Sequence, residues 1–219
     1  MDENSVMIYC LKYAQSVLPE SMVFLGGDKS KKIPIAFAVY LIKTQSKNIL
    51  IDAGCTTMPN FVMEDFVSPA LVLEKIGIKA KDVTDVIITH SHHDHIEAIK
   101  LFENANVYIT QEEYESASEY IGQTAKINII DDEYFIAPNI KAIKWGGHSK
   151  GSLIVEVKTD EATHIFAGDE CYINENLEKK IPTGSSFNLN KSKEFVEKFS
   201  DKKYCVHTCH DIKLKTERI

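Results

Sequence analysis

The sequence predicts an α/β protein of the αββα sandwich type, in which two mixed β-sheets pack face to face and helices flank them. Short apolar runs rich in β-branched residues recur along the chain, and helical stretches separate them in both halves. Side chains that commonly bind metals stand directly after several of these runs, which places a site at one edge of the sheets. No linker or low-complexity segment interrupts the chain, so we expect a single domain over residues 1–219.

The amino-terminal half is expected to contribute four strands and two helices. A polar stretch with glycines follows the first apolar run and is expected to be a loop, while Ser68 with Pro69 begins a helix that Gly77 ends. Residues 55–67 are irregular and apolar, so they either line a substrate mouth or pack on the core. The predicted strands cover residues 6–9, 35–42, 48–51 and 85–89, and the predicted helices cover residues 69–76 and 96–102.

The carboxyl-terminal half is expected to repeat this arrangement. Thr110 and Glu113 have the spacing of a capping box, which predicts a helix through residue 120. Asn190 is expected to cap a second helix over residues 191–199. The predicted strands cover residues 106–109, 126–130, 140–144, 152–158, 162–167 and 203–208.

Charge and composition restrict the partners of the chain. Its net charge is −7, which disfavours nucleic acid or an anionic membrane surface as a partner. Only Arg218 among the 25 basic residues is an arginine, so a bidentate grip on a strongly anionic substrate is disfavoured too. The acidic first residues do not resemble a signal peptide, and five cysteines without disulfide spacing favour a cytoplasmic location.

The stretch Thr89–His95 carries the strongest functional signal. It contains four histidines and one aspartate within six residues, directly after an apolar run that predicts a buried strand. In extended backbone, His90 and His92 share a face and can converge on one point. Asp94 and His95 follow at the start of a predicted helix, so the stretch supplies two groups of ligands. A histidine-rich surface loop is the alternative, but it is rare at this density.

Further ligands must come from elsewhere, because a metal site needs about three protein ligands. Three candidates each stand at the end of a strand-like run: His148 in a glycine-bearing turn, Asp169 after Gly168, and His210 near the carboxyl terminus. Ligands delivered from several strand ends indicate a sheet scaffold with its site at one edge.

These residues and their order resemble the metallo-β-lactamase-fold hydrolases, whose signature is H-x-H-x-D-H followed by His, Asp and His. The runs Ile49–Gly54, Gly147–Ser152 and Gly168–Asp169 add to the resemblance, which covers nearly the whole chain. It implies the metallo-β-lactamase fold and two divalent transition-metal ions per chain, zinc in the first place, with iron or manganese as alternatives. The resemblance assigns ligands to a first metal, to a second metal and to a bridge between them: His90, His92 and His148; Asp94, His95 and His210; and Asp169.

Within this superfamily the sequence resembles the N-acyl-homoserine lactone lactonases, because Tyr172 stands three residues after Asp169. A tyrosine at that position faces the scissile carbonyl in those enzymes, where a phenol can donate a hydrogen bond to the developing oxyanion. The resemblance implies a quorum-quenching hydrolase that opens a lactone by attack of a metal-bridging hydroxide on the carbonyl. Asp94, Asp169 and Tyr172 are the expected catalytic residues, and Asp94 would also steer the proton.

Three other residues near the motif bear on the resemblance. Asp52, at the end of a predicted strand, is expected to support the metal-binding loop. Glu97 stands where the family usually has a small residue and is expected to point away from the site. Cys209 precedes His210 where glycine is common, and is expected to be an inert packed side chain.

Two alternative functions use the same fold. A glyoxalase-II-type thioesterase would share the metal site, but it needs cationic residues for glutathione and usually an added helical domain. A non-catalytic metal-binding module is disfavoured because the ligand set is intact. We therefore expect a metal-dependent hydrolase that acts on a small-molecule lactone or ester, as a monomer or a homodimer.

Overall fold

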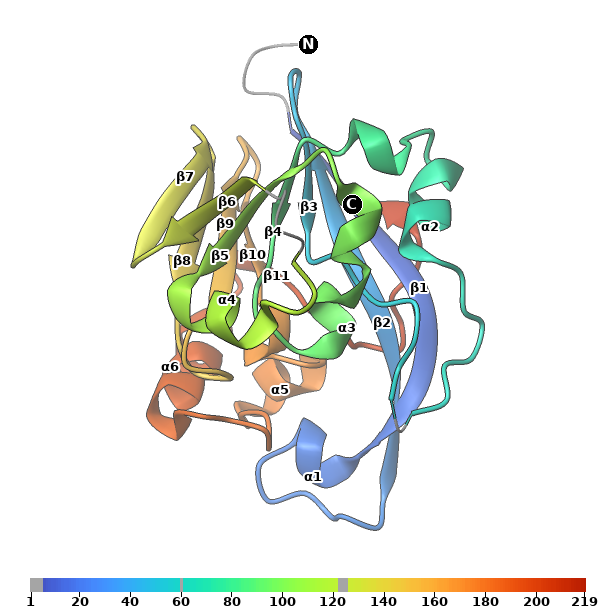
Figure 1. Cartoon of the computed structure of the whole chain (residues 1–219). Coiled ribbons are helices and arrows are strands. Elements are labelled where there is room, and N and C mark those ends of the chain that lie inside the picture. The colour runs from blue at the N-terminus through green and yellow to red at the C-terminus, as the bar shows by residue number, and fades with distance from the viewer. Residues whose placement is uncertain (1–5, 60, 122–125) are drawn as a thin grey trace.

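Two β-sheets stacked face to face form the centre of the molecule, and helices cover the outer face of each sheet (Figure 1). The computed structural model describes residues 6–59, 61–121 and 126–219. Both sheets contain parallel and antiparallel pairs, so the architecture is the predicted αββα sandwich of mixed sheets.

The larger sheet has seven strands and the smaller has five. The larger has the spatial order β12 (Glu217–Arg218), β1 (Met7–Pro19), β2 (Lys32–Lys43), β3 (Asn48–Ile51), β4 (Asp85–Ile87), β5 (Asn106–Thr110) and β6 (Lys126–Ile130). The smaller has the order β11 (Tyr204–His207), β10 (Thr163–Phe166), β9 (Leu153–Lys158), β8 (Ile140–Lys144) and β7 (Glu133–Ala137).

Short helices complete the fold, and none of those described is both long and apolar enough to cross a membrane. The α-helices are α1 (Glu20–Val23), α2 (Pro69–Lys75), α3 (His93–Ile96), α4 (Gln111–Ala117), α5 (Asn174–Lys179) and α6 (Leu189–Phe199). Turns of 3₁₀ helix occupy Ala80–Asp82, Glu97–Phe102 and Gly168–Glu170.

The buried apolar residues form three clusters, one between the two sheets and one on the outer side of each sheet. Alternate residues of β2 point to opposite faces, so Phe37 belongs to the cluster that includes residues of α2, α3 and α4, while Tyr40 packs between the sheets. There the Tyr40 ring meets Phe166 of β10 edge-on, with ring centroids 5.0 Å apart. On the far side, Phe195 and Phe199 of α6 cover the smaller sheet. Burial on both faces explains why β2 is an uninterrupted apolar run.

The structure corrects the predicted extent of the first strand. β1 continues ten residues beyond Tyr9, to Pro19, and pairs with the whole of β2. Lys12 and Gln15 interrupt its apolar pattern, and the register shifts between Lys12 and Ala14, which hides the alternation of a strand. The short elements α1, α5, β7 and β12 were not predicted, because each is six residues or shorter.

One predicted helix start and one predicted capping box are wrong, whereas α4 begins after Thr110 as predicted and ends at Ala117 rather than at residue 120. α6 begins at Leu189, and its cap is Asn188, which accepts a hydrogen bond from the Lys191 amide at 3.3 Å, rather than Asn190. At α4, Thr110 occupies the cap position without making a capping bond. Glu113 does not return to the cap either, because it binds two loops of the site described below. The helix expected over residues 96–102 is the 3₁₀ turn that continues α3.

Loops at one end of the two sheets carry the predicted ligands. β3 and β4 run parallel, so Asp52 and His90 emerge side by side just beyond their carboxyl ends. The segments that follow β8, β10 and β11 bring His148, Asp169 and His210 to the same end. The fold therefore assembles the site from segments that are far apart in sequence.

Candidate metal centre

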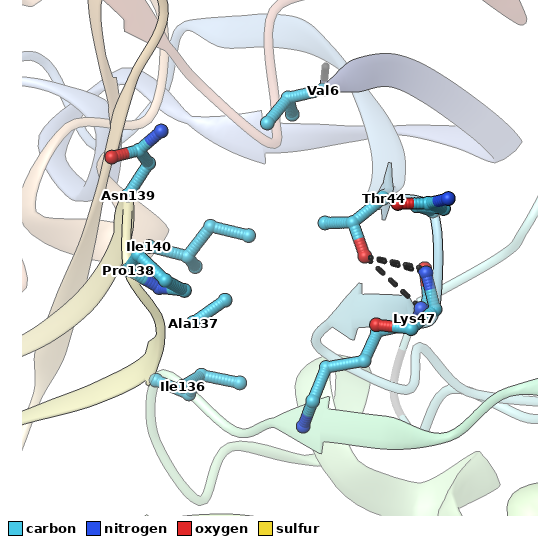
Figure 2. A pocket seen from close by; sticks show the side chains of 10 residues that line it. Val6, Thr44, Lys47, Ile136, Ala137, Pro138, Asn139 and Ile140 are labelled. Carbon is cyan, nitrogen blue, oxygen red and sulfur yellow. Dashed lines mark hydrogen bonds between the residues drawn. The ribbon is translucent and has the colours of Figure 1, made fainter. Parts of the chain in front are cut away.

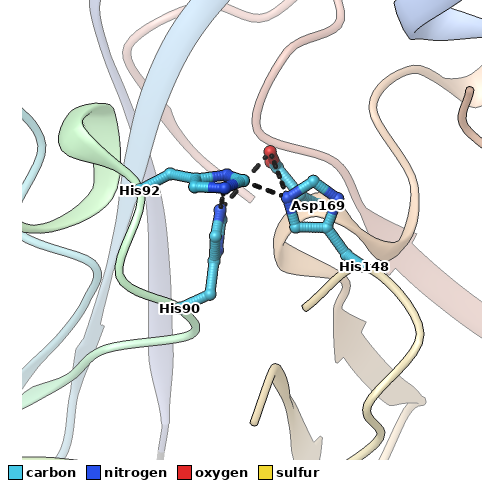
Figure 3. Close-up of side chains that lie close together, drawn as sticks. All are labelled: His90, His92, His148 and Asp169. Atoms are coloured by element: carbon cyan, nitrogen blue, oxygen red, sulfur yellow. Dashed lines mark hydrogen bonds and ion pairs between the residues drawn. The ribbon is translucent and has the colours of Figure 1, made fainter. Parts of the chain in front are cut away.

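Three imidazoles and one carboxylate converge in a first cluster, formed by His90, His92, His148 and Asp169 (Figure 3). The Nδ1 atom of His92 lies 3.0 Å from the Nε2 atom of His90 and 3.0 Å from the Nε2 atom of His148. Imidazole nitrogens this close together fit around one metal ion, because each metal–nitrogen bond is about 2.0–2.1 Å long.

A second cluster adjoins the first and contains His95, His210 and Asp94. The Oδ2 atom of Asp94 lies 3.6 Å from the Nε2 atom of His95 and 3.5 Å from that of His210. Cys209 also lies in this group, and its thiol donates a hydrogen bond to Asp169 at 3.3 Å. Burial raises the pKa of the Cys209 thiol well above its usual range, so the thiol stays protonated. Its hydrogen bond to Asp169 shows that Cys209 contacts the site and is more than a packed side chain.

Asp169 lies between the two clusters and presents one oxygen to each. Its Oδ2 atom is 3.5 Å from the Nε2 atom of His90 and 3.4 Å from that of His148. Its Oδ1 atom is 3.2 Å from the Nε2 atom of His95 and 3.1 Å from that of His210. A carboxylate placed in this way can bridge two cations.

The protonation of the clusters suits metal binding. Burial lowers the pKa of His90 and of His148 to about 3, so both imidazoles are neutral with a free lone pair. Burial also lowers the pKa of His95, but the neighbouring carboxylates, Asp169 foremost, raise it well above 6.5. The Nε2 atom of His95 is buried without a hydrogen-bond partner among the described residues. The second cluster thus attracts positive charge, which a metal ion would supply.

Asp52 supports the metal-binding loop, as predicted. Its Oδ1 atom accepts a hydrogen bond from the Thr89 amide at 2.7 Å, and its Oδ2 atom accepts one from the Thr89 hydroxyl at 2.9 Å. The Nδ1 atom of His95 donates to the same Oδ2 atom at 2.7 Å. Because Nδ1 donates to Asp52, Nε2 is the nitrogen that faces the site, where a metal ion would replace its proton.

Two other buried carboxylates, Glu170 and Glu113, lie behind the site and were not predicted from the sequence. Glu170 accepts hydrogen bonds from the amides of Gly147 and His148, both at 2.9 Å, and burial raises its pKa to about 7. Glu113 contacts the loops that carry His148 and His90. For Glu170 a signal exists in the sequence, because it follows Asp169 inside an apolar run. For Glu113 the capping box spacing concealed the role.

A cavity of about 240 Å³ opens onto the clusters, and none of its described lining residues is a lysine or an arginine. Tyr172 lines it and is 4% exposed, with its ring 5.2 Å from that of His210. Burial raises the pKa of Tyr172 well above 10, so its phenol is a hydrogen-bond donor at neutral pH. The remaining lining is mostly apolar: Leu18, Met22, Ile35, Phe37, Met58 and Phe61.

The segment after Gly54 forms part of the wall of this cavity and is tied to the metal-binding helix. Glu97 accepts a hydrogen bond from the Thr56 amide at 2.6 Å, so it does point away from the metals, as predicted. The Nε2 atom of His93 lies 2.8 Å from the carbonyl of Thr57. Both alternatives for this segment hold in part, because Met58 lines the cavity and also packs against the core.

A second, larger cavity of about 480 Å³ lies at the opposite end of β3, between the β2–β3 turn and the β7–β8 turn (Figure 2). Lys47 lines it, but the Lys47 ammonium is paired with the buried Asp85 at 3.0 Å. The described lining contains no histidine, cysteine or carboxylate. Among its described residues, this cavity therefore offers no group that commonly binds a metal, in contrast to the smaller cavity at the clusters.

Comparison with known proteins identifies the family. The family model of the metallo-beta-lactamase superfamily matches residues 38–205, which is more than half of the chain. The chain belongs to the metallo-beta-lactamase superfamily. The sandwich of two sheets and the order of the ligands agree with that membership.

Similar members of the superfamily include lactonases. An N-acyl homoserine lactonase of Bacillus cereus is 26% identical over 202 residues, which cover 79% of this chain and 80% of the relative. A solved N-acyl homoserine lactone hydrolase, with N-hexanoyl-L-homoserine bound at its catalytic metal centre, superimposes with a TM-score of 0.83. The two structures share 21% identity and cover 97% and 98% of each other's chains. The dizinc quorum-quenching lactonase AidC has a TM-score of 0.75 at 17% identity, over 100% of this chain and 95% of that one.

Proposed function

We propose that this protein is a dinuclear metal-dependent hydrolase that opens the ring of an N-acyl-homoserine lactone or a related lactone. The observation that carries the proposal is the position of Asp169, whose two oxygens each face one pair of imidazoles. The family membership and the similarity to a Bacillus cereus lactonase support it. We further propose one domain, a cytoplasmic location and zinc as the native metal, since a similar structure is a dizinc lactonase.

The proposed ligands follow the two clusters. His90, His92 and His148 would hold one ion, His95, His210 and Asp94 the other, and Asp169 would bridge them. Two bound ions would supply a water of lowered pKa as nucleophile and would polarise the lactone carbonyl.

The side chains around the ions would position the substrate and handle its charge. The Tyr172 phenol, protonated at neutral pH, would donate a hydrogen bond to the carbonyl oxygen as negative charge develops on it. The carboxylate of Asp94 stands at the cavity and would take up the proton released during the attack. The apolar wall would exclude water from the reacting carbonyl and pack against the apolar part of the substrate.

The proposal is tested by supplying purified, zinc-loaded protein with an acyl-homoserine lactone, a simple γ-lactone and a glutathione thioester. We expect ring opening of the lactones to be faster than thioester hydrolysis, because no lysine or arginine among the described lining residues offers a site for glutathione carboxylates. A preferred thioester would make the protein a thioesterase of the same fold. Full metal content without turnover of any substrate would favour a non-catalytic metal-binding module.

A further inference from the structure

We propose that Glu113 is a positioning residue of the metal centre, which fixes the geometry of the first cluster by joining the two loops that carry its imidazoles. The inference rests on the metal-binding part of the proposed function and not on the identity of the substrate. It assigns a role to a side chain that lies on α4, outside every segment of the ligand signature.

Glu113 is 3% exposed and accepts four hydrogen bonds from the two loops. Its Oε2 atom accepts from the Ser91 amide at 2.9 Å and from the Ser91 hydroxyl at 2.6 Å. Its Oε1 atom accepts from the Ser149 hydroxyl at 2.7 Å and from the Gly151 amide at 2.9 Å. Ser91 stands between His90 and His92, and Ser149 follows His148, so one carboxylate contacts the neighbours of all three imidazoles.

The loop of His148, which includes Gly151, packs closely against α4 and the end of β5. The Thr110 hydroxyl donates a hydrogen bond to the Gly151 carbonyl at 2.9 Å. A Cβ atom at position 151 would lie 2.2 Å from the Thr110 Oγ1 atom and 3.0 Å from the Glu113 Cγ atom, which explains the glycine. Thr110 and Glu113 therefore hold Gly151 from two sides, in place of forming a capping box.

A carboxylate suits this position better than any other side chain. Each oxygen of Glu113 receives one backbone N–H and one hydroxyl, and a backbone N–H can only donate. In either orientation, the amide of a glutamine would place its NH₂ group against one of the two backbone N–H groups. Glu113→Gln therefore keeps the shape of the side chain but loses the bond to the backbone N–H of one loop, where only donation to the serine hydroxyl remains possible. An aspartate is one methylene shorter and would reach less far from α4.

Glu170 differs from Glu113 because its hydrogen bonds reach only one of the two loops. Glu170 accepts hydrogen bonds from Gly147, His148 and Ser152, all of which lie in the loop of His148. It fixes that loop internally but, in these contacts, does not reach the loop of His90 and His92. Asp52 holds Thr89 and His95, so of Asp52, Glu113 and Glu170 it is Glu113 that contacts both loops of the first cluster.

The test compares the zinc-loaded wild type with Glu113→Gln and with the matched control Glu112→Gln. Glu112 is the preceding residue on the same helix, and its carboxylate pairs with Lys144 at 2.7 Å. Zinc per folded chain is measured by elemental analysis after graded exposure to a chelator. Anomalous scattering from crystals of each variant then shows which of the two positions has lost its ion.

We expect Glu113→Gln to bind zinc about 10–100-fold more weakly at the first cluster, as is typical when a group that orients metal ligands is lost. The second cluster should stay occupied, so that zinc content falls from near two ions to near one, and Glu112→Gln should match the wild type. Equal loss from both clusters, or retention like that of the wild type, would overturn the inference. A merely structural role would lower the melting temperature without changing the relative occupancy of the two positions.

Two further variants keep the test decisive if Glu113→Gln does not fold. Ser91→Ala and Ser149→Ala each remove one hydroxyl donor to Glu113 but leave the backbone donors in place. Each should show a smaller loss of zinc that is also confined to the first cluster, and unchanged retention in both would contradict the inference. If the wild type itself fails to retain two ions, the proposed function fails and not the role of Glu113 alone.

Discussion

The two halves of the metal centre are held in place in different ways. In the second cluster, the Nδ1 atoms bind fixed acceptors directly: His95 donates to Asp52 at 2.7 Å, and His210 donates to the Ala36 carbonyl on β2 at 2.9 Å. In the first cluster, the Nδ1 atom of His90 lies 3.1 Å from the Thr89 hydroxyl, but the Nδ1 atom of His148 is buried without a hydrogen-bond partner among the described residues. The loop of His148 is fixed instead, through Glu113 and Glu170.

This difference indicates two ways of fixing the orientation of a metal-binding imidazole. Direct bonding fixes the rotation and the tautomer of an individual imidazole, whereas Glu113 and Glu170 fix backbone segments and so position the ring of His148 through its loop. We therefore expect the two clusters to respond to different substitutions, and the following experiments test that expectation.

The largest effect is expected for Asp169→Asn, which acts on both clusters at once. An amide has a single acceptor oxygen and no charge, so it would bridge two cations poorly. We expect hydrolytic activity to fall by several orders of magnitude and at least one ion to be lost, while the circular dichroism spectrum stays that of the wild type. Near-normal turnover together with two retained ions would show that Asp169 does not bridge the two clusters.

Asp52→Asn should affect the second cluster selectively. An NH₂ group in place of Oδ2 would face the Nδ1–H of His95 and favour the tautomer that carries its proton on Nε2, the atom aimed at Asp169. The backbone at Asp52 has a φ of 61°, which asparagine tolerates well. We expect about 10–100-fold weaker metal binding at the second cluster, measured by the same chelator titration.

The pair Asp52→Asn and Glu113→Gln therefore forms a double test. Loss of the ion at the first cluster in Asp52→Asn would remove the distinction between the two clusters. The Thr89 hydroxyl, which links Asp52 to the Nδ1 atom of His90 at 3.1 Å, is the contact through which such an effect would travel.

Tyr172→Phe should leave both clusters intact and affect catalysis alone. Loss of an oxyanion donor costs about a hundred- to thousandfold in rate, and a metal that shares the oxygen reduces this. We expect a fall of roughly tenfold to a hundredfold, mainly in kcat on lactones, with unchanged zinc content and melting temperature. Unchanged rates on every lactone would remove Tyr172 from the proposed mechanism.

The smallest effect concerns His164 and His207, two neighbouring histidines that belong to neither cluster. The Nδ1 atom of His164 lies 2.9 Å from the Nε2 atom of His207, and His207 stacks on Phe166. Burial lowers the pKa of His207 to about 3, whereas the unfolded chain takes up this proton near pH 6.5. Stability must therefore fall as pH drops below 6.5, by about 1.4 kcal/mol per pH unit for one such group until pH approaches 3.

His207→Phe should flatten this part of the pH profile. Chemical denaturation of the wild type and the variant between pH 6.5 and 5 measures the difference, and metal release at low pH is common to both proteins. Parallel profiles would show that His207 is protonated in the folded state, and that buried imidazoles here do not resist charging as His90 does.

The fold and the ligand set could be predicted from sequence because both leave local patterns. β2 is an apolar run, and the histidines from 90 to 95 lie within one stretch. Asp52 could be predicted as a support, because it directly follows a strand-like run in a segment that resembles the family. Glu113 could not, since its hydrogen-bond partners are 22 and 36–38 residues away along the chain. The full length of β1 was not predicted for a related reason. Its polar residues fit a strand only because β2 and the 62–67 segment pair with it. Contacts of this kind depend on tertiary structure, which single-sequence patterns do not contain.

The attachment of the cavity wall to the metal-binding helix has a consequence for how the protein can change. Glu97 contacts Thr56, and His93 contacts Thr57. The backbone amide of Ala98 donates to the Gly54 carbonyl at 3.0 Å, so hydrogen bonds connect the wall to the helix that carries His95. A substitution that widens the mouth by displacing Met58 must strain the segment that carries the ligands. Leu18 and Met22 also line the cavity but lie on β1 and α1, so substitutions there would change the size of the cavity with less effect on the ligand-bearing segment.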